Sequence, residues 1–217
     1  MTLEAMDQYL LPTYYINSDS KVVTQLADSI CKGLSDDSNK AKAIFYWVRD
    51  KILYDVHSFS PDKSQYKASE IIKNGAGWCV PKACLLAALS RAMGIPSRLH
   101  FSDIRNHQIT EKLLAEMGSN IFYFHGYTEF YLNSNWVKVT PAFNSELCEK
   151  FAHKTVEFDG INDALLHTET INGERHVEYL NDRGVYADLP FEEMLSVFAD
   201  VYASDMPESS TFLEQDN

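Results

Sequence analysis

Cysteine and histidine are the side chains in this sequence whose positions could support covalent chemistry. The four cysteines, Cys31, Cys79, Cys84 and Cys148, are too few for a disulfide scaffold. A thiol attacks only as the thiolate, so a catalytic cysteine benefits from a helix N-terminus and from an imidazole that takes its proton. Cys79 meets the first condition, because the run VPKACLLAALSRAMG, with Pro81 in its first turn, predicts a strong helix.

A buried small apolar side chain is the alternative interpretation of a free cysteine, and it suits Cys31, Cys84 and Cys148. Cys84 follows Cys79 in the same predicted helix, and the pair lacks the CxxC spacing of a redox or metal site. For Cys79 taken alone, a structural role and a role as nucleophile both stay open.

His125 is the histidine that lies within a predicted hairpin. The extended runs are IFYFHGYTEFYL and NWVKVT, joined by a polar turn at 133–135. Alternation with a period of two places His125 on the same strand face as Glu129. No metal-ligand spacing is present among the six other histidines: His57, His100, His107, His153, His167 and His176. We expect no metal site.

The remaining pattern predicts the elements that position these side chains. Apolar residues at helical spacing predict helices at 20–34, 41–53, 68–73, 79–94, 110–117 and 190–202. Further strands are expected at 97–101 and 175–180, with a turn at 181–184. The glycines of 75–77 predict a sharp turn before Cys79.

Composition limits the possible partners and locations. The 217 residues carry 19 basic and 31 acidic side chains, a formal charge of -12 that would repel nucleic acid and anionic lipid. No stretch is long and apolar enough to span a membrane, and the first fifteen residues do not resemble a signal peptide. We expect a cytoplasmic protein with no nucleic-acid or membrane partner.

Domain organisation and cofactors follow from the same scan. The absence of repeats and linkers predicts one domain over 1–203, followed by a mobile acidic tail at 204–217. No GxxxxGK or GxGxxG motif is present, so no nucleotide cofactor is expected.

Three blocks in a fixed order resemble the transglutaminase-like superfamily, whose fold is similar to that of papain-like cysteine peptidases. The blocks are GAGWCVPKACLLAALSRAMGIPSR, FHGYTEFYL and NWVKVTP, and the resemblance covers 41–143. It implies that Cys79 is the nucleophile and His125 the base. It also implies an α+β fold, in which a helical layer carrying Cys79 at a helix N-terminus packs on an antiparallel sheet.

Thr140 is where the sequence departs from this family. The family has an aspartate before proline at the position that Thr140 occupies here, and that aspartate orients and stabilises the imidazole. Three residues could orient His125 instead. Thr140 ranks first by position, Asn144 could act as an asparagine does in papain-like peptidases, and Glu129 could reach His125 along the shared strand face.

Two aromatic residues are candidates for the surroundings of the nucleophile. The backbone N–H of Cys79 is the natural first donor to an oxyanion, and Tyr54 is a candidate second donor. Trp78 could form a wall of the acyl pocket. Both also suit a purely structural role as packed aromatic residues.

The leading functional hypothesis is a cysteine-nucleophile acyl-transfer enzyme. It would hydrolyse or transamidate an amide bond in a peptide, a protein or a small amide, through a thioester on Cys79. The alternative is a non-catalytic binding module that keeps the fold and has relaxed its triad, as Thr140 suggests.

Overall fold

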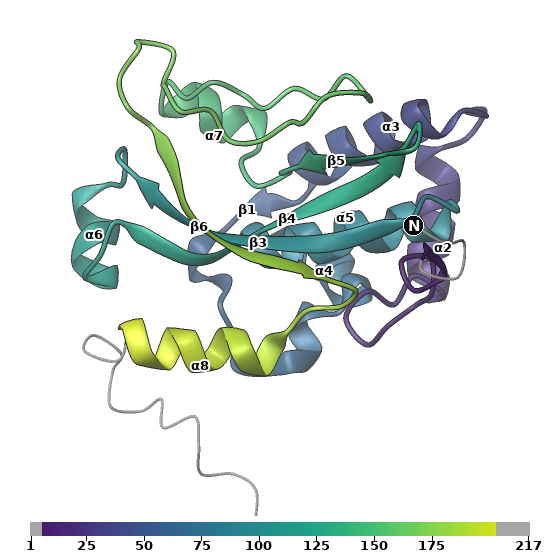
Figure 1. Cartoon of the computed structure of the whole chain (residues 1–217), viewed down its shortest axis with the longest axis horizontal. Helices are drawn as coiled ribbons and strands as arrows, with labels where there is room; N and C mark the ends of the chain where they lie inside the picture. The colour runs from purple at the N-terminus through teal and green to yellow at the C-terminus, as the bar shows by residue number, and fades with distance from the viewer. Residues whose placement is uncertain (1–5, 203–217) are drawn as a thin grey trace, which may run out of the picture.

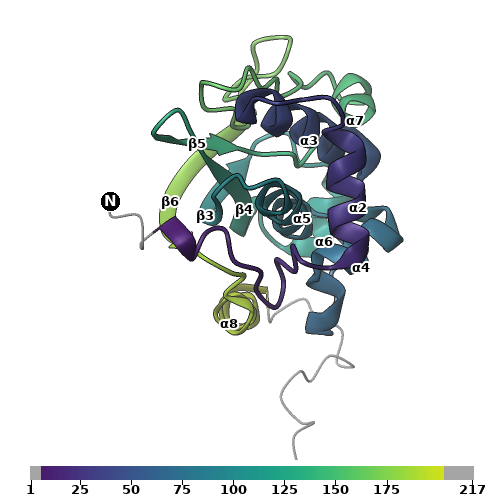
Figure 2. The same cartoon turned by 90° about the vertical axis from the view of Figure 1, so that its right-hand side faces the viewer.

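Helix α5 forms the centre of the molecule, and the other elements pack around it. The computed structural model describes residues 6–202. Its helices are α2 (Lys21–Ile30), α3 (Asp37–Lys51), α4 (Ala68–Asn74), α5 (Cys79–Ala92), α6 (Glu111–Met117), α7 (Ser145–Lys150) and α8 (Phe191–Tyr202), with short 3-10 turns η1 (Val56–Ser58) and η2 (Lys63–Tyr66). Figure 2 shows α5 enclosed by α2, α3 and α4 on one side and by a sheet on the other.

An antiparallel sheet covers the second side of α5. Its strands are β3 (Ser97–Asn106), β4 (Ile121–Leu132), β5 (Asn135–Val139) and β6 (Val177–Tyr186), in the order β5-β4-β3-β6. The predicted hairpin is confirmed as β4 and β5, which join through Asn133 and Ser134, both with positive φ. Helix α8 runs alongside β6 (Figure 1). The expected α+β fold with a helical layer on an antiparallel sheet is thus confirmed.

The nature of α5 follows from its sequence. Every residue from Cys79 to Arg91 is buried, because apolar residues occupy most positions on all sides of this helix. Gly94, with φ of 78°, follows the last turn and lets the chain leave the helix as predicted.

The predicted turn at 181–184 is wrong, because β6 continues through it to Tyr186. This stretch pairs with β3, and register shifts on either side of Ser102 and Asp103 absorb its irregular spacing. The carboxylate of Asp103 also accepts hydrogen bonds from the side chains of Asn181 and Arg183. A tertiary partner therefore satisfies the polar residues that resembled a turn.

Two further differences concern the end of one strand and a helix that the sequence did not predict. Strand β3 continues five residues beyond the predicted 97–101, to Asn106. Helix α7 was not predicted, and it begins after Asn144. A short parallel pair, β1 (Leu53–Tyr54) and β2 (Ala76–Gly77), fixes the segment before α5 against the end of α3.

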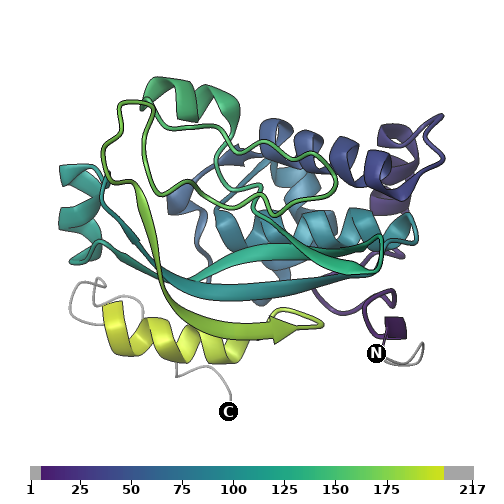
Figure 3. The ribbon, with the colours of Figure 1, turned by 45° about the horizontal axis from the view of Figure 1, so that its top comes forward.

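A long segment between α7 and β6 forms one end of the molecule (Figure 3). The buried guanidinium of Arg49 in α3 holds it, donating to the Val156 carbonyl at 2.7 Å and to the Ser145 hydroxyl at 2.9 Å. The Asp50 carboxylate accepts from both the backbone N–H and the hydroxyl of Ser145. These contacts hold in place the segment 151–176, which contributes side chains to the cleft at Cys79.

Lys82 is a fully buried lysine in α5 that joins two helices. Its ammonium donates to the carbonyls of Arg49, at 2.9 Å, and Ile52, both at the C-terminal end of α3. Burial lowers the pKa of Lys82 to about 7. A donor at a helix C-terminus satisfies carbonyls that have no partner within the helix.

No helix in the described part of the chain has the length and apolar character needed to cross a bilayer. The predicted tail at 204–217 lies outside the described residues, as does the last residue of the predicted domain.

We predict that Lys82→Met lowers the free energy of unfolding by about 1–3 kcal/mol, because two buried carbonyls lose their donor while the apolar stem stays packed. Urea unfolding measures the change. The matched control is Lys73→Met, which removes an exposed ion pair with Glu70 and should cost less than about 1 kcal/mol. Equal effects of the two variants would contradict the role given to Lys82.

Candidate functional site

Cys79 is the first residue of α5, and its thiol is almost covered. The side chain lies at a helix N-terminus, with Trp78 as the residue before the helix. The backbone N–H groups of Gly126, Val80 and Cys79 face the sulfur and lower its pKa, but burial outweighs them and raises the pKa to about 12. The helix N-terminus alone therefore does not produce a thiolate here.

Gly126 in β4 allows the strand to approach α5 closely. A Cβ added at Gly126 would lie 3.1 Å from the Val80 side chain and 3.1 Å from the Phe101 ring, so tight that these neighbours would have to shift. Two residues on, the Thr128 hydroxyl donates to the Ala83 carbonyl at 2.9 Å. These contacts fix β4 against the first turns of α5 and so bring His125 to the nucleophile's end of the helix.

His125 precedes Gly126 and lines the same pocket as Cys79. The residue is 3% exposed, and its Nε2 has no hydrogen-bond partner among residues 6–202. The rings of Tyr127 and Tyr179 pack beside it, with centroids at 6.1 and 6.2 Å. Burial lowers the pKa of His125 to about 3. The imidazole is therefore neutral beside a neutral thiol in the resting structure.

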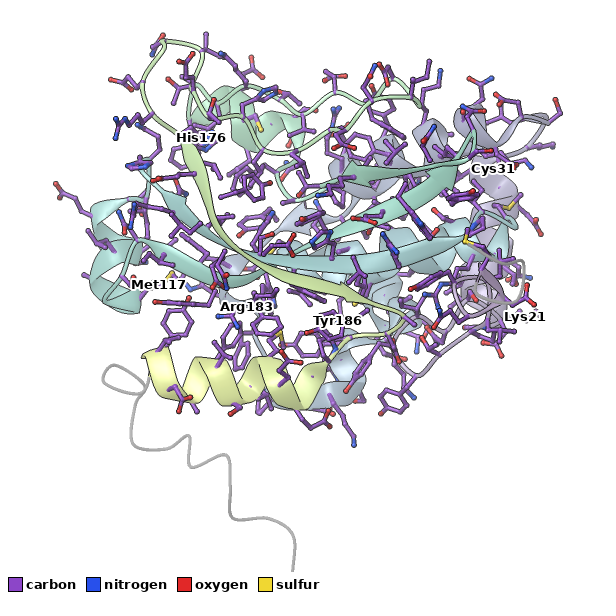
Figure 4. All side chains as sticks on the ribbon, in the orientation of Figure 1. Lys21, Cys31, Met117, His176, Arg183 and Tyr186 are labelled. Carbon is purple, nitrogen blue, oxygen red and sulfur yellow. The ribbon has the colours of Figure 1, made fainter. Side chains whose placement is uncertain are left out.

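A strained bulge aims His125. Phe124, the residue before it, has φ of 55°, which is costly for a residue with a side chain. The buried Asp103 carboxylate accepts the Phe124 N–H at 3.1 Å and pairs with Arg183. The Arg183 guanidinium lies over the Phe124 ring at 4.6 Å. Figure 4 shows Arg183 on β6, on the side nearest α8.

No predicted orienting residue bonds His125. The Thr140 hydroxyl is buried without a hydrogen-bond partner, although its backbone N–H donates to Ala164. The Asn144 side chain accepts the Tyr54 N–H at 3.3 Å. Glu129 is a buried carboxylate bound to Arg98 and to His100. Packing by aromatic rings is the constraint that the described residues place on the imidazole.

A cleft of two connected lobes meets at Cys79. The base lobe, of about 280 Å³, contains His125 and polar side chains that include Asn106, Gln108 and Lys112. The aromatic lobe, of about 350 Å³, contains Trp78 and lacks His125. Tyr54 lines both lobes, and burial raises its pKa well above the usual value.

The other cysteines lie elsewhere. Cys31, Cys84 and Cys148 are buried and free, and none of them lines either lobe. Figure 4 places Cys31 at the opposite end of the molecule from Met117, which lines the aromatic lobe.

A pair of neighbouring histidines, His153 and His176, borders the base lobe. The rings of His153 and His176 lie with centroids 3.9 Å apart, and neither nitrogen of His176 has a hydrogen-bond partner. Burial and the neighbouring His153 lower the pKa of His176 to about 4. Within residues 6–202, no three histidine, cysteine or acidic side chains group closely enough to hold a metal ion.

Sequence reasoning did not find Asp103, Gly126 or the aromatic contribution of α8. Asp103 and Gly126 act through contacts between distant strands and helices. The positive φ of Phe124 has no signal in its residue type, because phenylalanine rarely adopts it.

We predict that acid destabilises the fold through its buried histidines. The pKa values of His125 and His176 are lower in the folded state, about 3 and about 4, than the ordinary value near 6.5. The unfolded state therefore binds more protons below about pH 6.5, and the free energy of unfolding should fall from pH 6.5 to pH 5.

Urea unfolding at several pH values measures this slope. His176→Phe should flatten it, while the matched variant His57→Gln should not, because the His57 ring is 64% exposed. A slope that His176→Phe leaves unchanged would contradict the assignment.

We also predict that Asp103→Ala disturbs His125. The change leaves Arg183 unpaired and should lower the free energy of unfolding by about 3 kcal/mol. It should also shift the imidazole NMR signals of His125, because the Phe124 bulge loses its acceptor. Asp103→Asn keeps an acceptor oxygen and should retain those signals. Glu178→Ala removes an exposed partner of Arg105 and is the control; an equal shift there would contradict the positioning role.

Two solved structures are similar to this chain. The Cytophaga hutchinsonii structure, described as a candidate cysteine protease, has 21% identity and a TM-score of 0.56, covering 89% of this chain and 50% of its own. This chain therefore spans half the length of that protein. The periplasmic domain of TgpA from Pseudomonas aeruginosa has 16% identity and a TM-score of 0.46, covering 65% of this chain and 48% of its own.

No curated protein matches the chain significantly. The model of the transglutaminase-like superfamily matches residues 24–141, more than half of the sequence, from within α2 to the residues just after β5. The fold shared with the Cytophaga hutchinsonii protein and the order of the Cys79 and His125 blocks agree with that match. This chain belongs to the transglutaminase-like superfamily.

Proposed function

We propose that this protein is a cysteine-nucleophile acyl-transfer enzyme that acts on an amide bond in a peptide or related molecule. One observation carries the proposal: Cys79 and His125 line one pocket, at a helix N-terminus where backbone N–H groups surround the sulfur. A thiol, a base and oxyanion donors are the components that acyl transfer through a thioester requires.

The reaction begins from a neutral pair. His125 takes the thiol proton as the Cys79 sulfur attacks the carbonyl carbon, so the charge forms during attack. The backbone N–H groups of Cys79 and Val80 have no partner within the helix and can donate to the oxyanion. The imidazolium then gives its proton to the departing amine, which leaves a thioester on Cys79.

The second half of the reaction releases the acyl group. His125 removes a proton from the attacking molecule, which is water or an amine. The oxygen of the water, or the nitrogen of the amine, attacks the thioester carbon. The Cys79 thiolate leaves and regains a proton from the imidazolium. Hydrolysis needs only water, and we propose it as the main outcome, with transfer to an amine as the variant reaction.

A non-catalytic binding module is the second candidate. It is favoured by the absence of a carboxylate on His125 and by the partnerless hydroxyl of Thr140 among the described residues. Under this alternative, the cleft would bind a ligand while Cys79 stayed a neutral buried thiol.

Acylation by p-nitrophenyl acetate separates the two candidates. An enzyme should release a burst of p-nitrophenol and carry an acetyl group on Cys79, detected by mass spectrometry of the peptides. Cys79→Ala should abolish the burst, and His125→Ala should slow it about 100-fold or more. Cys31→Ala is the matched control, because Cys31 lies outside the cleft. A burst that survives in Cys79→Ala, or no burst at all, would support the binding module.

A further inference from the structure

The two lobes of the cleft differ in chemistry, and His125 lines only one of them. Under the proposed function, His125 must give a proton to the departing amine, so the leaving group has to lie in the base lobe. The polar side chains of Asn106, Gln108 and Lys112 in that lobe suit an amine and the chain attached to it. The acyl group is then left to the aromatic lobe on the other side of Cys79.

The aromatic lobe is lined mainly by rings. Trp78 lies 6.4 Å from Phe59 and 5.9 Å from Phe198, measured between ring centroids, and Phe59 lies 5.9 Å from Phe198. Phe122, Tyr123 and Tyr202 also line the lobe. The volume of about 350 Å³ falls within the roughly 300–1,000 Å³ range of small-molecule pockets. A guest ring would extend this set of tilted and edge contacts, which favour aromatic partners.

The lobe also disfavours an anionic guest. Glu116 is the one carboxylate among the described residues that line it, and it lies 3.8 Å from His57 and 3.7 Å from Lys112. Both partners are exposed, so this ion pair lies toward solvent while the rings cover the interior. A carboxylate entering the lobe would lose much of its hydration, and no lysine or arginine among the described residues lines the lobe to pair with it.

Helix α8 makes the lobe a fixed feature. Phe198 is 7% exposed, and the Tyr202 hydroxyl donates to the Ile121 carbonyl at 3.1 Å while accepting the Tyr123 N–H at 3.2 Å. This helix lies beyond the residues that match the family model, and it adds Phe198 and Tyr202 to a lobe whose other lining residues lie inside that match.

We propose that the aromatic lobe is the acyl-side specificity pocket and accepts an uncharged aromatic group. The substrate is thus an amide whose acyl part carries an aryl side chain next to the reacting carbonyl, with the amine part directed into the base lobe. This inference rests on the proposed function for the identity of the reacting bond.

The test compares p-nitrophenyl esters that share a leaving group and differ in the acyl part. The 3-phenylpropanoate ester should acylate Cys79 at least about 10-fold faster than the acetate, because its ring buries apolar area in the lobe. The anionic succinate monoester should be slower than the acetate. Equal rates for the three esters would overturn the proposal.

Two substitutions in α6 test whether the selectivity between the esters arises in the aromatic lobe. Met117→Trp places a large ring in the lobe and should lower the ratio of phenylpropanoate to acetate rates by about 10-fold. Leu114→Trp introduces the same residue on the exposed face of α6, away from both lobes, and should keep the wild-type ratio. Equal ratios in the two variants would place the selectivity outside this lobe.

A binding measurement keeps the inference separate from the reaction. The unreactive 3-phenylpropanamide should bind the Cys79→Ala protein more tightly than propanamide, and Met117→Trp should weaken that binding. If the esters fail to acylate Cys79 but this binding pattern holds, the proposed reaction fails and the aromatic pocket stands. If the two amides bind equally, the pocket assignment fails.

Discussion

The contact between Gly126 and Val80 is the constraint on which the site depends. A β-strand and a helix usually stand apart by the thickness of their side chains, but here the absence of one Cβ lets β4 touch the first turn of α5. Cys79 begins the helix and His125 precedes the glycine, so one close approach determines that both side chains line the same cleft. The hydrogen bond from Thr128 to Ala83 maintains this approach along the helix.

Burial sets the electrostatic state of the pair. Three backbone N–H groups face the Cys79 thiol, yet burial keeps its pKa far above neutral. Burial also lowers the pKa of the His125 imidazole. Many thiol enzymes hold their cysteine and histidine as a thiolate–imidazolium ion pair before the substrate binds. In this protein, charge separation would accompany attack on the substrate. Within residues 6–202, no carboxylate contacts His125, so no buried negative charge there raises the pKa of its imidazole.

The family core and the rest of the chain divide the cleft between them. Residues 24–141 supply Cys79, His125 and the sheet. Most residues that line the two lobes also lie in this stretch, and later residues complete them, with Phe198 and Tyr202 in the aromatic lobe and Phe151 and His153 in the base lobe. The Arg49 and Asp50 network fixes the segment around α7, and the Tyr202 hydroxyl fixes α8.

The sequence by itself determined most of the helices and the central hairpin, and it supplied the candidate site residues. A largely apolar run predicts α5, alternation and a polar turn predict the β4–β5 hairpin, and the order of blocks predicts the roles of Cys79 and His125. Such signals are local, because they depend on spacing within one element. The tertiary structure decided the rest. It turned the polar residues 181–184 into strand by giving them Asp103 as a partner, and it held Phe124 in a strained conformation. It paired Glu129 with Arg98 and His100. At Cys79, burial raises the thiol pKa more than the backbone N–H groups lower it. These outcomes depend on which distant groups meet and how much water is excluded, and no single stretch of sequence encodes either.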